Sequence, residues 1–267
     1  MKRLAALIAV GIVALGAAFY GGLYDISATD QHLAPTYWLL DTGMRRSVRS
    51  HASTIAVPHL AQPGQVQRGL GLYREHCAQC HGAPGVAPEG FALGMTPAPA
   101  NLVHTAREWP PADLYWVLKE GIKMTGMPAW KYRMPEDDLW ALVAFLQELP
   151  RLSPEEYRSR KTAEKTAAQP APAALPEAAR GRKAINQYAC VTCHAIPGIV
   201  GPNAPVGPPL AKIGTRGFIA GVLPNTPENM VRWLREPQAI NPRSAMPDLG
   251  VTERDAADIA AYLSSLR

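Results

Sequence analysis

The chain has 267 residues, enough for one large domain or two small ones, and its 47% hydrophobic and 18% charged residues exclude a wholly disordered chain. Valine–isoleucine–threonine alternation is nearly absent, which argues against an all-β sandwich or a long parallel sheet. The net charge of +5 is concentrated in residues 180–267, where ten basic and six acidic residues are spread without a nucleic-acid-binding motif, so they form either a solvated surface or a docking face for an acidic partner.

The first predicted element is an apolar helix. Lys2 and Arg3 precede an apolar run from Leu4 to Tyr24, whose 21 residues reach the length of about 20 that a membrane-spanning helix needs. The positive-inside bias keeps Lys2 and Arg3 in the cytoplasm and places the remaining chain in the periplasm of a bacterium. A signal peptide cleaved after Gly16-Ala17-Ala18 is the alternative. We expect residues 1–24 to be a retained anchor in the inner membrane, because the apolar run continues past that site.

Residues 25–61 form a predicted juxtamembrane segment. The run Tyr37–Leu40, followed by Arg45, Arg46 and Arg49, indicates a short amphipathic helix. This helix could lie near the membrane surface or pack on a partner subunit. The default expectation is that it covers the chain's own first domain.

All four cysteines lie in two identical motifs. Cys77-Ala78-Gln79-Cys80-His81 and Cys190-Val191-Thr192-Cys193-His194 share the pattern CxxCH and begin 113 residues apart. A thioredoxin-like CxxC needs no histidine there, and a structural zinc site needs both CxxC pairs in one small unit. The remaining interpretation is two covalently bound haem c groups. Each cysteine pair would form thioethers to the haem vinyl groups, and the histidines that follow, His81 and His194, would be the proximal iron ligands.

Each motif lies between an opening helix and a closing helix. In the first unit, residues 62–150, the sequence predicts an opening helix from about Gln65, a loop over Gly82–Pro99, and helices over Ala112–Glu120 and Glu136–Leu149. In the second unit, residues 177–267, it predicts an opening helix that carries Gly181, coil over Pro197–Pro209, and helices over Pro227–Arg235 and Thr252–Leu266.

Single residues refine this plan. Thr252 is expected to cap the last helix. Gly69 and Gly181 lie in the two opening helices and are expected to let the closing helices approach closely. Between the units, residues 151–176 end in an Ala/Pro tract that is expected to be extended. This linker either holds the two haems at a set separation or connects two domains that pack directly.

The sixth iron ligand separates an electron carrier from a catalyst, because a Met/His pair suits electron transfer. In the first unit we prefer Met127, which lies in the loop Gly126-Met127-Pro128 before the closing helix; Met124 and Met134 are the main alternatives. In the second unit we prefer Met246, in a loop at the matching place. Met230 falls within a helical run and is expected in the core.

Prolines near each motif are candidates to orient the proximal histidines. A backbone carbonyl that accepts the imidazole N–H fixes the ring and raises its basicity. Pro208 and Pro209 are the candidates for His194. For His81 the matching proline is open: Pro97 and Pro99 both qualify, and the alternative is that these prolines only stiffen the loop.

These residues resemble the class I cytochrome c family. The second unit, with the run Ile219–Met230 followed by Trp233-Leu234-Arg235 and Pro237-Gln238, is similar to the cytochrome c domain fused to subunit II of some haem–copper oxidases. The first unit is similar to cytochrome subunits that serve periplasmic dehydrogenases, through Pro99–Leu102, Gly121-Ile122, Met124 and Gly126–Trp130.

The resemblance implies an all-α fold of two tandem class I cytochrome c domains behind the N-terminal helix. It assigns the iron ligands His81 and Met127 in the first domain and His194 and Met246 in the second. One departure matters: no cysteine remains to build the cupredoxin copper site of a subunit II, so the chain is not expected to be that subunit.

The function that we expect is electron transfer without catalysis. A membrane-anchored dihaem cytochrome c would relay electrons from a quinol-oxidising complex or a periplasmic dehydrogenase to a terminal oxidase. The alternative is a dihaem enzyme such as a peroxidase, with one open iron and an acid–base cluster for which His104, Arg107 and Glu108 are the available residues. A haem-based sensor is the third hypothesis, although it would usually carry a signalling domain.

Overall fold

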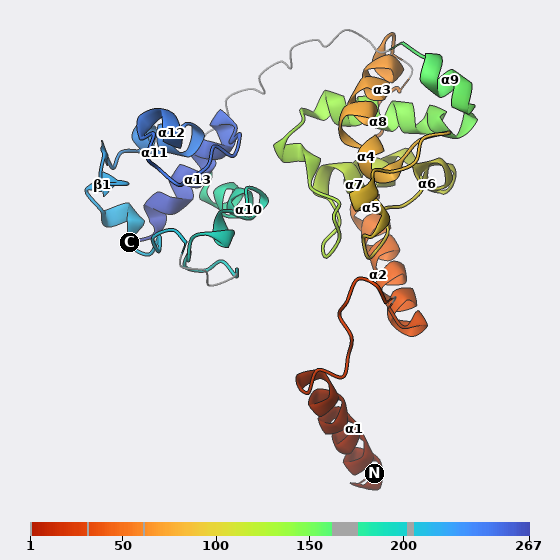
Figure 1. The fold of residues 1–267 in the computed structure, drawn as a ribbon, viewed down its shortest axis with the longest axis horizontal. Coiled ribbons are helices and arrows are strands. Elements are labelled where there is room, and N and C mark those ends of the chain that lie inside the picture. The colour runs from red at the N-terminus through yellow and green to blue at the C-terminus, as the bar shows by residue number, and fades with distance from the viewer. Residues whose placement is uncertain (1, 31, 61, 162–175, 202–205) are drawn as a thin grey trace.

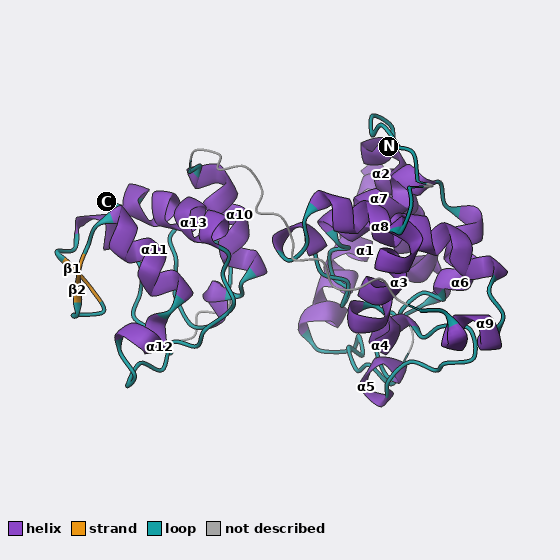
Figure 2. Ribbon diagram, turned by 90° about the horizontal axis from the view of Figure 1, so that it is seen from above, coloured by secondary structure: helices purple, strands orange, loops and turns teal. Residues whose placement is uncertain are grey.

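The computed structural model describes residues 2–30, 32–60, 62–161, 176–201 and 206–267 (Figure 1). These residues are mainly helical and pack around two separate hydrophobic cores, as the two lobes in Figure 2 show. Their one sheet is a short antiparallel hairpin, β1 (Phe218–Ile219) and β2 (Leu223–Pro224), in which Phe218 pairs with Pro224 and Ile219 with Leu223. The all-α prediction is confirmed.

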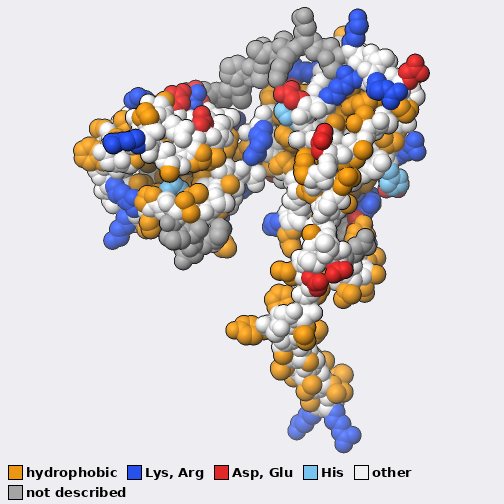
Figure 3. All heavy atoms as spheres, viewed as in Figure 1, with side chains coloured by type: hydrophobic (Ala, Val, Ile, Leu, Met, Phe, Trp, Pro, Cys, Tyr) orange, Lys and Arg blue, Asp and Glu red, His pale blue; other side chains and the backbone are white. Residues whose placement is uncertain are grey.

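Helix α1 (Lys2–Tyr20) has no buried residue, and apolar side chains cover it up to the basic side chains at its N-terminal tip (Figure 3). Within the described part of the chain it is the single helix that is long and apolar enough to cross a membrane, a test that a signal sequence also passes. The helix ends four residues before the predicted limit at Tyr24. Gly22 adopts a left-handed conformation (φ +72°) that stops it.

Helix α2 (Ala34–Ala52) divides into two halves. Its C-terminal half packs against the first domain, where Val48 and Ala52 are buried and the ring of His51 lies 5.3 Å from that of Trp116. Its N-terminal half leaves the side chains of Tyr37–Leu40 exposed. The expectation that this segment covers the first domain is therefore confirmed for the C-terminal half.

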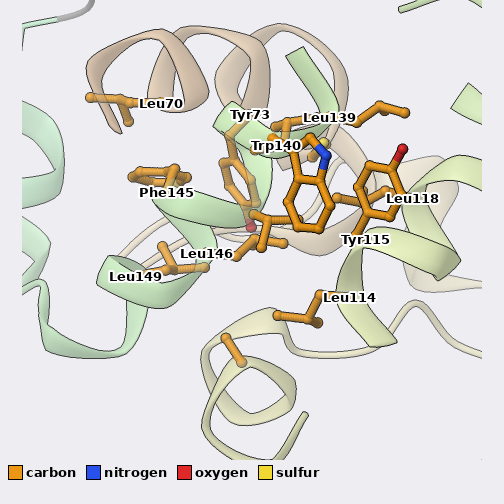
Figure 4. Packing of buried hydrophobic residues seen from close by; sticks show 14 of the residues in the cluster. Leu70, Tyr73, Leu114, Tyr115, Leu118, Leu139, Trp140, Phe145, Leu146 and Leu149 are labelled. Atoms are coloured by element: carbon orange, nitrogen blue, oxygen red, sulfur yellow. The ribbon is translucent and has the colours of Figure 1, made fainter. Parts of the chain in front are cut away.

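The first core forms where α3 crosses α8. Figure 4 shows its aromatic centre, in which Tyr115 stacks on Trp140 with ring centroids 3.9 Å apart and Tyr73 lies against Phe145 at 5.2 Å. The elements of this domain are α3 (Gln65–His76), α4 (Ala78–His81), α5 (Gly90–Leu93), α6 (Leu102–Glu108), α7 (Pro111–Glu120), the 3-10 turn η1 (Trp130–Tyr132), α8 (Glu136–Glu148), η2 (Leu149–Arg151) and α9 (Pro154–Ser159).

The second core repeats this crossing with α10 and α13, and α11 packs against α13. Thr252 caps α13 as predicted, because its side chain accepts a hydrogen bond from the Asp255 amide at 3.1 Å. The elements are α10 (Ala178–Gln187), η3 (Cys190–Thr192), η4 (Ile213–Thr215), β1, β2, α11 (Pro227–Arg235), α12 (Pro237–Ile240) and α13 (Glu253–Ser265).

A glycine at each crossing lets the helix backbones touch. A Cβ on Gly69 would lie 2.0 Å from the carbonyl oxygen of Ala141, and one on Gly181 would lie 1.9 Å from that of Asp258. Both distances are far below van der Waals contact. The predicted role of the two glycines is confirmed.

An arginine–aspartate pair lies beside each glycine. Arg68 of α3 pairs with Asp138 of α8, and Arg180 of α10 holds both carboxylate oxygens of Asp258 at 2.8 Å. Asp138 and Asp258 are buried, and the arginine beside each offsets part of the cost of burying a carboxylate. The two domains thus share the same partly buried ion pair, which we did not predict from the sequence.

The predicted linker, residues 151–176, begins with ordered structure. Ser153 and Glu156 form a reciprocal capping box at the start of α9, and Tyr157 of α9 is buried in the first core. The Ala/Pro tract that follows lies outside the described residues. The two domains also touch directly, because the guanidinium of Arg133 donates to the carbonyl oxygen of Gln187 at 3.0 Å.

Candidate haem sites

The first CxxCH motif lies on one helical turn. Helix α3 ends at His76, and α4 continues the chain so that the His81 amide donates to the Cys77 carbonyl at 2.9 Å. Gly82 ends the turn with φ +62°. Cys77 and Cys80 are free thiols one turn apart, which is the arrangement that two thioethers to one haem require.

His81 is held by a backbone carbonyl. Its Nδ1–H donates to the oxygen of Ala100 at 2.7 Å, and burial lowers the pKa of the ring, so the imidazole is neutral. The Nε2 lone pair then remains available for a metal. The prediction that Pro97 or Pro99 supplies this carbonyl is wrong. The carbonyl of Ala100 lies just outside α6, whose cap Asn101 binds the first helical amides and fixes the chain at this point.

The second motif has the same geometry. The His194 amide donates to the Cys190 carbonyl at 3.0 Å, and His194 Nδ1 donates to the oxygen of Pro208 at 2.8 Å. The prediction for Pro208 is confirmed. Gly207 lies against the imidazole, since a Cβ there would be 2.5 Å from Cε1 of His194. We did not predict this contact, because a glycine in a Pro-rich coil gives no sign of what it faces.

The surroundings of the motifs fit haem. An apolar cavity of about 390 Å³ lies beside the second motif, with Val191, Ile196, Ile199 and His194 among its lining residues. At the first motif, the ring of Trp130 lies 5.4 Å from that of His76, next to Cys77. The Trp130 indole nitrogen is buried and finds no acceptor among the described residues. A carboxylate of a bound group would satisfy this N–H, and haem carries both an apolar plate and carboxylates.

The methionines of the first domain have different surroundings. Met127 is partly buried and packs against the first core, and its carbonyl accepts the Ile122 amide at 3.2 Å. Met124 is 84% exposed, whereas Met134 is buried in the core. In this domain the structure leaves Met127 as a half-buried loop methionine, and its role as a ligand stays a prediction.

The two methionines of the second domain also differ in burial. Met230 is buried in the core of α11, as expected. Met246 is a partly buried loop residue that packs against the same core, with its amide 3.1 Å from the Ser244 hydroxyl. Its assignment as the sixth ligand also stays a prediction.

The residues of the enzyme hypothesis lie on the surface of α6. His104 and Glu108 form an exposed pair at 3.2 Å, one turn apart, and Arg107 donates to the Pro150 carbonyl at 3.3 Å. Across the described residues there is no group of three or more His, Cys, Asp or Glu side chains that could hold a metal ion.

The comparisons with known proteins match each of the two domains to a family. Residues 64–146 match the family described as cytochrome c oxidase, cbb3-type, subunit III, and residues 178–267 match cytochrome c. Both domains are cytochrome c domains. Cytochrome c domains bind haem c covalently and transfer electrons, and the four cysteines fit that attachment. The predicted family and the two-domain architecture are confirmed.

Curated relatives match a limited part of the chain. Cytochrome c oxidase subunit 2 of Alkalihalophilus pseudofirmus is 35% identical over 89 residues, 33% of this chain and 25% of that protein. The proteins of the same name from Bacillus sp. PS3 and Bacillus subtilis are each 32% identical over 100 residues, and the matches cover 28% and 26% of their length. The chain thus spans about a quarter of these relatives. No solved structure gives a significant match.

Proposed function

We propose that the chain is a membrane-anchored dihaem cytochrome c that carries single electrons on the periplasmic side of a bacterial inner membrane. The observation that carries this proposal is the matched pair of proximal histidines. Both have Nδ1 tied to a backbone carbonyl, at 2.7 Å in the first domain and 2.8 Å in the second. This leaves Nε2 of each ring for one iron, directly after a cysteine pair that fixes one haem.

Each side chain has one task in this proposal. The four cysteines would attach the haems, His81 and His194 would each bind one iron, and Met127 and Met246 would each supply the sixth ligand of one iron. Haem, when bound, supplies a reversible one-electron iron couple. With a histidine and a methionine on each iron, neither iron would have a free position for a substrate, so the chain would act as a carrier.

The proposed location at the periplasmic face of the membrane suggests which proteins would exchange electrons with the chain. Helix α1 would hold the chain at the membrane, and the domains would exchange electrons with redox proteins there. The donor would be a quinol-oxidising complex or a periplasmic dehydrogenase, and the acceptor a terminal oxidase. The names of the matched families and relatives, all oxidase subunits apart from the general cytochrome c family, support an oxidase as the acceptor.

Carbon monoxide tests the coordination. In the reduced wild-type protein neither haem should bind the gas, because both axial positions are filled. The variants Met127→Ala and Met246→Ala should each open one site, seen as a change in the Soret spectrum of one haem. Met124→Ala is the matched control, because that side chain is 84% exposed and its removal should open no site.

A pyridine haemochrome assay supplies the haem count, which should be two per chain. Gas binding by a wild-type haem would overturn the carrier proposal and favour the enzyme or sensor hypothesis. Gas binding by Met124→Ala but not by Met127→Ala would move the ligand of the first domain to Met124.

A further inference from the structure

A small polar contact joins the two cytochrome c domains. The turn after η1 in the first domain presents Arg133, whose Nη2 donates to the Gln187 carbonyl at 3.0 Å. The same guanidinium lies over the ring of Tyr188, 5.9 Å from its centroid. The Tyr188 hydroxyl lies 3.1 Å from the carbonyl oxygen of Tyr132 and donates to Asp255 at 2.8 Å. We call this set of residues the interdomain contact.

Both sides of the interdomain contact are braced within their own domains. Arg133 Nη1 donates to the Ala129 carbonyl at 3.3 Å, and the neighbouring Lys131 forms an ion pair with Glu120 of α7. On the other side, burial and the Asp255 carboxylate raise the pKa of Tyr188 to about 12, so its hydroxyl keeps its proton. Tyr132 belongs to the first domain, and its side chain packs against the core of the second, so it adds an apolar contact across the interface.

The contact lies between the two haem sites along the chain. Tyr132 ends the η1 turn that follows the Met127 loop, and Tyr188 stands two residues before Cys190. In Figure 1 the second domain accordingly lies beside the segment between α7 and α8. The loop that carries the candidate iron ligand of the first domain is thus attached to the segment that leads into the haem motif of the second.

We propose that the interdomain contact fixes the separation of the two haem sites and makes electron exchange between them fast, with Arg133 as its main positioning residue. This inference rests on the proposed function. In the exchange, one electron leaves ferrous iron at one site and reduces ferric iron at the other, with no bond made and no proton moved. Because electron transfer falls steeply with distance, domains that drifted apart would exchange electrons slowly. Covalent connection helps a small contact to persist by raising the local concentration of each domain near the other.

Two variants of Arg133 test the proposal in the full-length protein with both haems. Arg133→Ala removes the hydrogen bond and the cation–π contact, and Arg133→Glu also places a negative charge near Asp255. Small-angle X-ray scattering should show a larger radius of gyration for both, and more so for Arg133→Glu. After flash reduction by a photo-excited ruthenium complex, electron exchange between the haems should slow by about tenfold or more, since loss of the contact removes the gain in effective concentration.

The matched control is Arg151→Ala, which removes the same charge from an exposed arginine of the first domain that pairs with Glu148. It should leave the scattering and the exchange rate at their wild-type values, and the spectrum of each haem should be the same in all variants. Scattering and exchange rates for Arg133→Glu that equal those of the wild type would overturn the proposal. Failure of the proposed function would appear differently, as a wild-type protein whose haems are not both reversibly reduced, and scattering would still report on the contact.

Discussion

At the scale of single residues, the geometry of the second candidate haem site depends on a glycine, Gly207, that leaves room for the ring of His194. Gly207 packs directly on the His194 imidazole, and its amide donates to the Cys193 carbonyl at 2.8 Å, so that the carbonyl of the next residue, Pro208, reaches Nδ1. The ring is therefore fixed by one glycine and one carbonyl. Orientation of a metal-binding histidine in this way sets both its tautomer and its basicity.

Gly207→Ala should weaken the second haem site alone. The new Cβ would lie 2.5 Å from Cε1 of His194, so the ring must move and lose its hydrogen bond to Pro208. We expect a loss of about 10–100-fold in the affinity of the histidine for iron, which is the usual cost of removing a partner of a metal ligand. A redox titration followed by the spectrum of each haem tests it, because a weaker histidine bond should shift the reduction potential of the second haem alone. Gly217→Ala is the control, because a Cβ there meets nothing within 4 Å; an equal effect of both variants would contradict the assignment.

A site residue could be predicted where its side chain makes the interaction or marks the position, and could not be predicted where an unmarked backbone carbonyl makes it. CxxCH pairs and Pro208 stand out in the sequence, and the pattern of a loop before the last helix singles out Met127 and Met246. The carbonyl that binds His81 could not be predicted, because every residue has one and nothing marks Ala100. Trp130 was noted within a motif, but only the assembled core shows that its buried indole N–H has no acceptor in the part of the chain that the structure describes.

At the scale of elements, each domain is held together by the same kind of crossing, in which its opening helix packs against its closing helix. Gly69 and Gly181 bring the opening helix against the closing helix, and Arg68 and Arg180 pair with buried carboxylates beside them. Removal of either arginine would leave a buried charge without its main partner. The crossing thus combines close backbone packing with an adjacent ion pair.

Gly181→Ala should destabilise the second domain. Its Cβ would meet backbone atoms of α13, starting with the Asp258 carbonyl oxygen at 1.9 Å, and backbone gives way less readily than a side chain. Overpacking of this kind costs about 1–3 kcal/mol in the free energy of unfolding. Denaturant unfolding, followed through the Soret band, measures it.

Gly43→Ala in α2 is the matched control for Gly181→Ala. It meets nothing within 4 Å and should leave stability unchanged or raise it by about 0.5–1 kcal/mol, because alanine favours helix. The close crossing would be disproved if Gly181→Ala were as stable as the wild type.

The long helices could be predicted from their periodicity, and the short elements could not. α3, α7, α8, α10, α11 and α13 all lie where the apolar spacing places them. α6 went unpredicted within a Pro-rich stretch, although Asn101 before Leu102 is a recognisable helix cap. The hairpin has two residues per strand, too few for an alternating pattern to appear.

At the scale of the whole molecule, the sequence predicts two domains but not how they meet. Tyr188 and the Tyr132 carbonyl are 56 residues apart, and neither belongs to a motif. The Arg68–Asp138 and Arg180–Asp258 ion pairs join residues that are 70 and 78 positions apart, and the sequence did not predict them either. Contacts of this kind depend on the assembled surfaces and leave no periodic trace in the chain.

The N-terminal helix should keep the full-length protein in the membrane. Cells that express residues 1–267 should retain the cytochrome in the carbonate-washed membrane fraction, with the mass of the uncleaved chain. A version in which residues 1–24 are replaced by a cleavable signal peptide should be released as a soluble haem protein. A mature full-length product that begins near residue 19 would show instead that the segment is a signal peptide.

The burial of Cys77 constrains the order in which the holoprotein is made. The cysteine is 6% exposed and belongs to the core that α3 and α8 close around it. A vinyl group can reach that sulfur only while the two ends of the domain are still apart. If haem is bound through Cys77, we therefore expect it to be attached while the chain is still open, and the crossing of α3 and α8 to form afterwards around the bound group.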